Sequence, residues 1–304
     1  MKNALKYYYN YEPIDIHFKN NNYFFSVSNQ FYVLYLCNLE DNDIQQIYEL
    51  QLNFFKNNIY THQIILNIEQ KFFTIIDNKK YVLMKMYNEM LDKVTKRMLL
   101  LFTEETSYIL KNYTNKISWK ELWKQKIDYF EYQLNEFGKK FTNLRKSFNY
   151  FVGMVEVGIS LLSNINNDAN ISISHRRINK DSTTFDLYNP FNFIIDYKIR
   201  DICEYFKYNF IKGEDVFNEI KEYLSTTNLN IDDSYLFFVR MLFPSFYFDS
   251  YEKIMNKYFY EDIIEENILN NIEEIALKYE KLLKKIYSFM KEYILIPRID
   301  WFEN

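Results

Sequence analysis

Glycine and proline are scarce in this chain, with four of each among 304 residues, and no glycine precedes Gly138. Both residues are typical of loops and sharp turns, so their scarcity disfavours a loop-dominated fold and favours long helices with a few strands. The part of the chain before Gly138 therefore also lacks a glycine-rich turn, through which backbone amides closely approach phosphate groups.

Other absences narrow the function classes further. The two cysteines, Cys37 and Cys203, lie far apart, and no C-x-x-C or Cys/His ligand spacing occurs, so we expect no zinc site. Lysine and arginine are dispersed and the net charge is −4, which disfavours nucleic-acid binding. No apolar stretch reaches the roughly 18 residues of a membrane span, and the N-terminus lacks the apolar core of a signal peptide. We therefore expect a protein of the reducing cytoplasm, without a membrane span.

The first part of the chain has the pattern of a small sheet. Hydrophobic residues make up 48% of the sequence and charged residues 26%, which is typical of a globular protein. Short runs of β-favouring residues between Asn-rich turns predict an antiparallel meander, with strands at 14–18, 23–27, 31–36, 72–76 and 81–86. Apolar residues at helical spacing predict one helix within this part, at 42–56.

After Asn88 the pattern becomes helical, apart from an irregular segment at 170–199 that contains a short apolar run. Ser118, with Glu121 three residues later, is expected to cap the second helix of this part. The predicted helices are 89–111, 118–137, 142–165, 200–211, 214–225, 232–243, 247–258 and 261–293.

This order of elements predicts an α+β, bilobal protein kinase-like fold. We expect a small N-lobe at 1–87, made of the antiparallel sheet and one helix, a hinge near 84–89, and a large, mostly helical C-lobe at 88–304.

Kinase-type phosphoryl transfer requires groups that can be sought in this sequence. A strand lysine, held by a helix glutamate, neutralises the phosphates; one aspartate orients the nucleophile, and a second aspartate holds Mg²⁺. Tyr35 stands where the strand lysine is expected, and Glu49 lies on the following helix, where the partner of that lysine would be. A single helical glutamate is more often solvated surface, so both interpretations of Glu49 stay open.

The sequence His-Arg-Arg at 175–177 has the shape of the kinase catalytic motif His-Arg-Asp, but Arg177 replaces the aspartate. An arginine cannot act as a general base, because its guanidinium stays protonated at physiological pH. The asparagine expected five residues later falls on Ser182, and the nearby Asn179 and Asn189 have a different spacing. No confident catalytic residue therefore emerges from this motif.

Asp196 directly follows the apolar run 193–195, which matches a buried strand that ends in a metal-binding aspartate. The same pattern is common for structural carboxylates, so Asp196 is a weak candidate for a Mg²⁺ ligand. We expect His175 to be a packed, hydrogen-bonded scaffold residue, and Asp201 to cap the free amides at the start of the helix 200–211.

Taken together, these segments resemble a known family over nearly the whole chain. The segments that carry the resemblance are 14–86, 118–123, 150–156, 175–177, 196–207 and 296–301. The chain is similar to the CotS/YutH group of spore coat-associated kinase-like proteins, within the aminoglycoside and choline phosphotransferase superfamily, and looks closest to its YutH-like branch. The resemblance implies a kinase-like fold, a role in sporulation and, for active members, ATP and Mg²⁺; it matches at His175 and Asp196, and loosely at Glu49.

Three hypotheses follow. The first is a catalytically degenerate kinase fold in the mother-cell cytoplasm or the spore coat, acting as an interaction module with coat proteins and needing no cofactor. The second is an atypical Mg-ATP-dependent phosphotransferase for a small molecule or a coat protein, in which Asp196 binds the metal and Arg176 or Arg177 contacts phosphate as a bidentate donor. In a variant of this hypothesis, Arg177 forms an ion pair with Asp196 and occupies the metal site. The third is a helical protein whose motif match is coincidental. We favour the first, because the glycine turn, the strand lysine and the catalytic aspartate are all missing.

Overall fold

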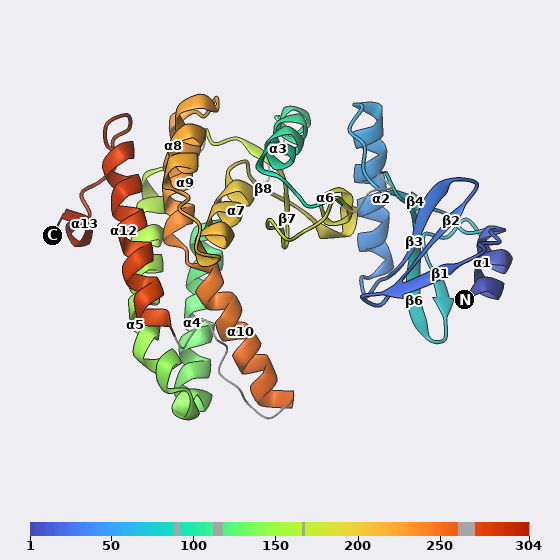
Figure 1. Cartoon of the computed structure of the whole chain (residues 1–304), viewed down its shortest axis with the longest axis horizontal. Coiled ribbons are helices and arrows are strands. Elements are labelled where there is room, and N and C mark those ends of the chain that lie inside the picture. Colours follow the sequence, from blue (N-terminus) through green and yellow to red (C-terminus); the bar gives the residue numbers. More distant parts are fainter. Residues whose placement is uncertain (88–91, 112–117, 166–167, 261–270, 304) are drawn as a thin grey trace. The chain divides into compact units, whose positions relative to one another are not determined.

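The computed structural model describes residues 1–87, 92–111, 118–165, 168–260 and 271–303. The chain forms two compact units, which Figure 1 draws with their elements labelled. The first unit combines Met1–Ile109 with His175–Ile194, and the second combines Leu110–Ser174 with Ile195–Asn304. A lobe boundary at residue 87 stays a prediction, since the segment 175–194 groups here with the N-terminal part.

The first unit is built on an antiparallel sheet in the order β1-β2-β3-β6-β4, with β5 also paired to β6. The predicted antiparallel meander is confirmed, and β4 is a strand that sequence reasoning missed. The strands are β1 (Ile16–Lys19), β2 (Asn22–Val27), β3 (Gln30–Leu36), β4 (Gln63–Ile65), β5 (Thr74–Ile76) and β6 (Lys79–Lys85).

Asparagine replaces glycine at the tight turns of this sheet. Asn20 and Asn21, between β1 and β2, have φ angles of 49° and 62°, in the left-handed region. Asparagine tolerates this region better than most residues, so a two-residue hairpin turn can form without glycine. The turn that precedes β2 is consequently a short hairpin turn rather than an extended phosphate-binding loop.

Two helices cover the two faces of the sheet. Helix α2 (Asp41–Lys56) packs its Ile44 with Val33 and Val82 on one face, and helix α1 (Lys2–Tyr9) packs its Leu5 with Leu34 and Leu83 on the other. Neighbouring strand residues thus alternate between two apolar clusters, as the two-residue period of a strand requires. Helix α1 was not predicted, whereas α2 was predicted within one residue.

Two helices, α3 and α6, and two short strands, β7 and β8, follow the sheet in the chain. Helix α3 (Lys96–Leu110) follows the sheet, and a second sheet pairs β7 (Ile171–His175) with β8 (Phe193–Tyr197), with helix α6 (Thr184–Tyr188) between them in sequence. The segment 170–199, predicted to be irregular, therefore contains regular structure, and the apolar run before Asp196 is the expected strand.

The second unit is helical, as predicted. Its long helices include α9, whose residues Tyr235–Leu242 are all buried. The helices are α4 (Trp119–Phe137), α5 (Thr142–Leu161), α7 (Arg200–Ile211), α8 (Phe217–Thr226), α9 (Ile231–Leu242), α10 (Ser245–Tyr260), α12 (Ile272–Met290) and α13 (Asp300–Glu303). No helix among the described residues is long and apolar enough to cross a bilayer.

A local signal in the sequence accounts for the start of α4. The Ser118 hydroxyl accepts a hydrogen bond from the Glu121 amide at the start of α4, which confirms the predicted cap. The residues 89–91 and 261–270, predicted to begin two helices, lie outside the described residues, as does part of the expected hinge.

Candidate functional site

A cleft of about 680 Å³ lies within the first unit, a volume in the range of small-molecule sites. The sheet and the segment after β7 both contribute to its walls. It is lined by Lys19, Asn20, Asn22, Phe24, Tyr35, Arg176, Arg177, Asp181, Thr183, Phe185, Asp186, Asn189, Phe191 and Asn192. Of the residues named from the sequence, the cleft therefore brings together Tyr35, Arg177 with its neighbour Arg176, and Asn189.

Tyr35, at the expected position of the strand lysine, forms part of an aromatic wall. Its ring stacks on Phe191 with a centroid distance of 5.2 Å and an interplanar angle of 26°. Burial raises the pKa of the Tyr35 phenol above its usual value, so the group is neutral at physiological pH. A neutral, stacked ring cannot supply the positive charge that a strand lysine supplies to phosphates.

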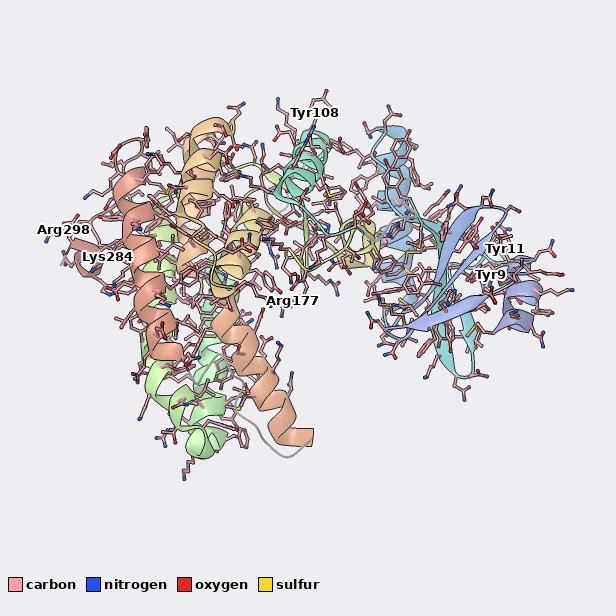
Figure 2. All side chains as sticks on the ribbon, in the orientation of Figure 1. Tyr9, Tyr11, Tyr108, Arg177, Lys284 and Arg298 are labelled. Carbon is pink, nitrogen blue, oxygen red and sulfur yellow. The ribbon has the colours of Figure 1, made fainter. Side chains whose placement is uncertain are left out.

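Arg177 stands in a turn that Asn192 fixes from both sides. The Arg177 amide donates to the Asn192 side-chain oxygen at 3.3 Å, and the Asn192 side-chain nitrogen donates to the Arg177 carbonyl at 3.0 Å. The Arg176 amide also donates to the Asn192 carbonyl at 2.8 Å. Both arginines are exposed, and Figure 2 labels Arg177 in the segment between β7 and α6. Asn192 thus sets the backbone from which two adjacent guanidinium groups extend.

Three cations and two carboxylates line the cleft. Asp181 forms an ion pair with Lys93 at 3.0 Å, and Asp186 accepts hydrogen bonds from the amide and hydroxyl of Thr183 in a capping box. The cations that line the cleft are Lys19, Arg176 and Arg177. Since three cations line the cleft with two carboxylates, one of which pairs with Lys93, the lining carries a net positive charge.

His175 is a buried residue of the first unit, with 2% of its surface exposed. Its Nε2 hydrogen-bonds to the Leu187 carbonyl at 2.9 Å, and its ring lies 5.4 Å from the rings of both Phe102 and Phe193. This is the environment expected of a packed scaffold residue.

Glu49 lies on the exposed face of α2, where its carboxylate accepts a hydrogen bond from Gln45 at 2.9 Å, one helical turn away. It is not among the residues that line the cleft. This placement favours the interpretation of Glu49 as a solvated helix residue, and a role in cofactor binding stays a prediction.

Asp196 belongs to the second unit, where other side chains bind both of its carboxylate oxygens. The indole nitrogen of Trp119 donates to Oδ1 at 2.8 Å, and Arg200, one turn into α7, pairs with Oδ2 at 2.6 Å. The Tyr197 amide adds a third donor to Oδ1 at 2.7 Å. Asp196 is only 6% exposed, so these bonds are largely shielded from water.

This arrangement does not suit a Mg²⁺ ion. Magnesium requires oxygen ligands in octahedral geometry and usually keeps several waters, whereas Arg200 already places a positive charge against Asp196. No group of three or more His, Cys, Asp or Glu side chains suited to a metal occurs in the part of the chain that the structure describes. Asp196 as a metal ligand therefore stays a prediction that the local bonding does not favour.

Asp201 lies in the first turn of α7, one residue inside the helix, and is buried. The N-cap position itself is occupied by Ile199, without a capping side chain. Asp201 thus lies at the helix start, where it was expected; its capping of free amides stays a prediction, and a carboxylate in the first turn suits the helix dipole.

Sequence reasoning missed a buried charge network in the second unit. Glu204 on α7 binds Lys207 at 2.6 Å and the Nη2 of Arg240 at 2.8 Å, and the Ser245 hydroxyl donates to its other oxygen. The Lys207 ammonium also donates to the carbonyls of Arg240 and Phe243 at 3.3 and 3.0 Å. The available signal was the pair Glu204 and Lys207, three residues apart among the mostly apolar residues that follow Asp201 in α7.

Arg240 connects this network to the tryptophans of α4. Its guanidinium carbon lies 5.1 Å from the centre of the Trp119 ring and 5.9 Å from that of Trp123, within the range of a cation–π contact. The ring of Trp119 is thus held on one side by Arg240, while its nitrogen binds Asp196. Buried charges, aromatic rings and Asp196 form one continuous set of contacts inside the second unit.

The fold is that of the kinase-like phosphotransferases, as solved structures show. Spectinomycin phosphotransferase APH(9)-Ia, solved in complex with ADP and spectinomycin, superposes with a TM-score of 0.56 at 13% identity, covering 95% of this chain and 97% of its own. An aminoglycoside phosphotransferase from Alicyclobacillus acidocaldarius gives a TM-score of 0.52 at 8% identity, covering 92% and 91%. The predicted kinase-like α+β fold is confirmed.

Within this class, the chain belongs to the family described as "Spore coat putative kinase YutH", whose model matches residues 2–293. A curated relative, the endospore coat-associated protein YutH of Bacillus subtilis (strain 168), is 26% identical over 213 residues. The match covers 60% of this chain and 60% of that relative's length. The family resemblance seen in the sequence is therefore confirmed.

Proposed function

We propose that this protein is a catalytically degenerate member of its family, which acts as an interaction module with spore coat proteins during sporulation. We place it in the mother-cell cytoplasm during coat assembly and then in the coat. The association of its relative with the endospore coat supports the coat role. The main support for the loss of catalysis is that Trp119 and Arg200 bind the two carboxylate oxygens of Asp196.

Two further features support the same conclusion. Tyr35 replaces a cation with a neutral stacked ring, and Arg177 replaces a general base with a group that stays protonated. Charge neutralisation, metal binding and nucleophile orientation each contribute to phosphoryl transfer, and no single compensation restores all three.

The competing function is an atypical Mg-ATP-dependent phosphotransferase, and nucleotide binding separates the two. Thermal unfolding of the full chain is measured with millimolar ATP and MgCl₂, with ATP and EDTA, and with MgCl₂ alone. We expect no magnesium-dependent rise in the midpoint. The matched variant is Asp196→Asn, which keeps the side-chain volume and removes the charge that a metal ligand needs. A magnesium-dependent rise that Asp196→Asn abolishes would establish the phosphotransferase instead.

The role in the coat is tested in the sporulating host with the same variant. We compare strains that carry the wild-type gene, the gene for Asp196→Asn and a deletion, and measure the protein composition of purified coats. We expect the deletion to alter coat composition and the variant, at equal protein level, to preserve it. Because Asp196 pairs with the partly buried Arg200, the unfolding midpoint of the variant is measured as well. A coat defect equal to that of the deletion, in a variant that stays folded, would indicate that catalysis is needed.

A further inference from the structure

We propose that the cleft of the first unit binds a phosphate monoester carried on an aromatic group, and that it does so without a divalent cation. The inference rests on the proposed function, because a metal-free anion site presupposes that the cleft does not serve Mg-ATP. It concerns only residues of the first unit.

The charge of the cleft supplies the first argument. Lys19 reaches it from the end of β1, and Arg176 and Arg177 from the turn after β7. Two carboxylates, Asp181 and Asp186, line the same cleft, and Lys93 compensates the charge of Asp181. An excess of positive charge with few competing carboxylates favours an anion, and no metal is needed to neutralise it.

The type of cation supplies the second argument. A guanidinium group is planar and donates two parallel hydrogen bonds, a geometry that matches the oxygens of a phosphate. The backbone of Arg177 is held at both its amide and its carbonyl by Asn192. Because these bonds already fix the backbone of the turn, ligand binding need not order it, so the backbone of the site is preorganised.

The aromatic residues of the lining supply the third argument. Tyr35 and Phe191 stack, and Phe24 and Phe185 meet edge to face with centroids 5.5 Å apart. These rings offer an apolar surface of the kind on which an aromatic ligand stacks. Because rings and cations line one cleft of about 680 Å³, an aryl group and its phosphate can be bound together.

The source of such a ligand is either a phosphorylated tyrosine of a protein or a small aryl phosphate, and the chemistry recognised is the same. The probes are phenyl phosphate, inorganic phosphate, phenol and a short peptide with and without phosphotyrosine. Binding to the full chain is measured by isothermal titration calorimetry in EDTA. We expect phenyl phosphate to bind more tightly than phosphate or phenol. Peptide binding that exceeds that of phenyl phosphate identifies the protein source, and weaker peptide binding identifies the small molecule.

Variants test the assignment to the cleft. Arg177→Gln is expected to raise the Kd of phenyl phosphate roughly ten- to a hundredfold, since it removes charge-assisted hydrogen bonds. Arg177→Lys keeps the charge but not the bidentate geometry and should lose part of the affinity. The control is Arg298→Gln, which makes the same change at an exposed arginine of the other unit and should leave the Kd unchanged.

The outcomes separate this inference from the proposed function. If phenyl phosphate does not bind in EDTA, or binds Arg177→Gln and the wild type equally, the inference is overturned while the loss of catalysis stands. If ATP binds only with Mg²⁺ and Asp196→Asn abolishes this binding, the proposed function fails and the inference fails with it. Circular dichroism of each variant establishes that a lost affinity is not a lost fold.

Discussion

The glutamate of the buried charge network gives the sharpest prediction for stability. Glu204 compensates two cations at once, Lys207 with a side chain 1% exposed and Arg240 with one 8% exposed. The substitution Glu204→Gln keeps the shape and removes the charge, which leaves both cations without their counter-ion. Removing one partner of a buried ion pair costs about 3–5 kcal/mol, because the other charge stays buried and uncompensated. We expect a loss of free energy of unfolding in this range.

Urea unfolding followed by far-ultraviolet circular dichroism measures this loss. With a urea dependence of about 3 kcal/mol per M, the expected shift is a midpoint lower by about 1 M or more. The matched control is Glu274→Gln. Its ion pair with Lys278 has the same length, 2.6 Å, but side chains that are 65% and 64% exposed, so its midpoint should not change measurably. Equal midpoints for the two variants would refute the reasoning that burial makes the Glu204 charge indispensable.

Two further predictions concern the same unit. Burial lowers the pKa of Lys207 to about 8, although Glu204 opposes the shift. Above pH 8 the unfolded chain therefore binds more protons than the folded protein. The free energy of unfolding should consequently rise from pH 8 to 9.5, relative to that of Lys207→Met. Burial also raises the pKa of Cys203, which changes stability with pH in the opposite direction. Because both proteins contain Cys203, the difference between the wild type and Lys207→Met isolates the effect of Lys207. An equal pH dependence of their unfolding free energies would contradict the lowered pKa of Lys207. Asn230→Ala removes the capping box with Asp233 at the start of α9 and should cost about 1 kcal/mol in urea unfolding, whereas Asn230→Ser should retain most of it; equal losses would contradict the capping argument.

Regular elements with a clear period were predictable from the sequence. Helix α2 was placed within one residue, and the strands of the meander were found because β-favouring residues form short runs between Asn-rich turns. Helix α1 and strand β4 were missed, since α1 is a short tyrosine-rich helix and β4 has three residues. Three residues carry too few repeats of a period to identify a strand on their own; β5 is equally short, but it lies within the predicted run 72–76.

The candidate site was only partly predictable. Tyr35 and Arg177 were found because a strand and a motif fixed their positions, and the structure places both in one cleft. The clamp of Asn192 on Arg177 was not foreseen, because its spacing of 15 residues follows no helical or strand period. Helix α7 has the predicted bounds, 200–211, and places Asp201 in its first turn, where the capping of free amides stays a prediction.

By itself the sequence determined the order of the elements, the family and the residue types that replace a kinase's glycine turn, lysine and base. These are properties of local pattern and of single positions. Only the tertiary structure decided what the remaining residues do. Trp119 binds Asp196 across 77 positions of sequence, and Glu204 meets Arg240 across 36. Such partners are selected because burial forces each charge and each polar group to find a neighbour, wherever in the chain that neighbour lies.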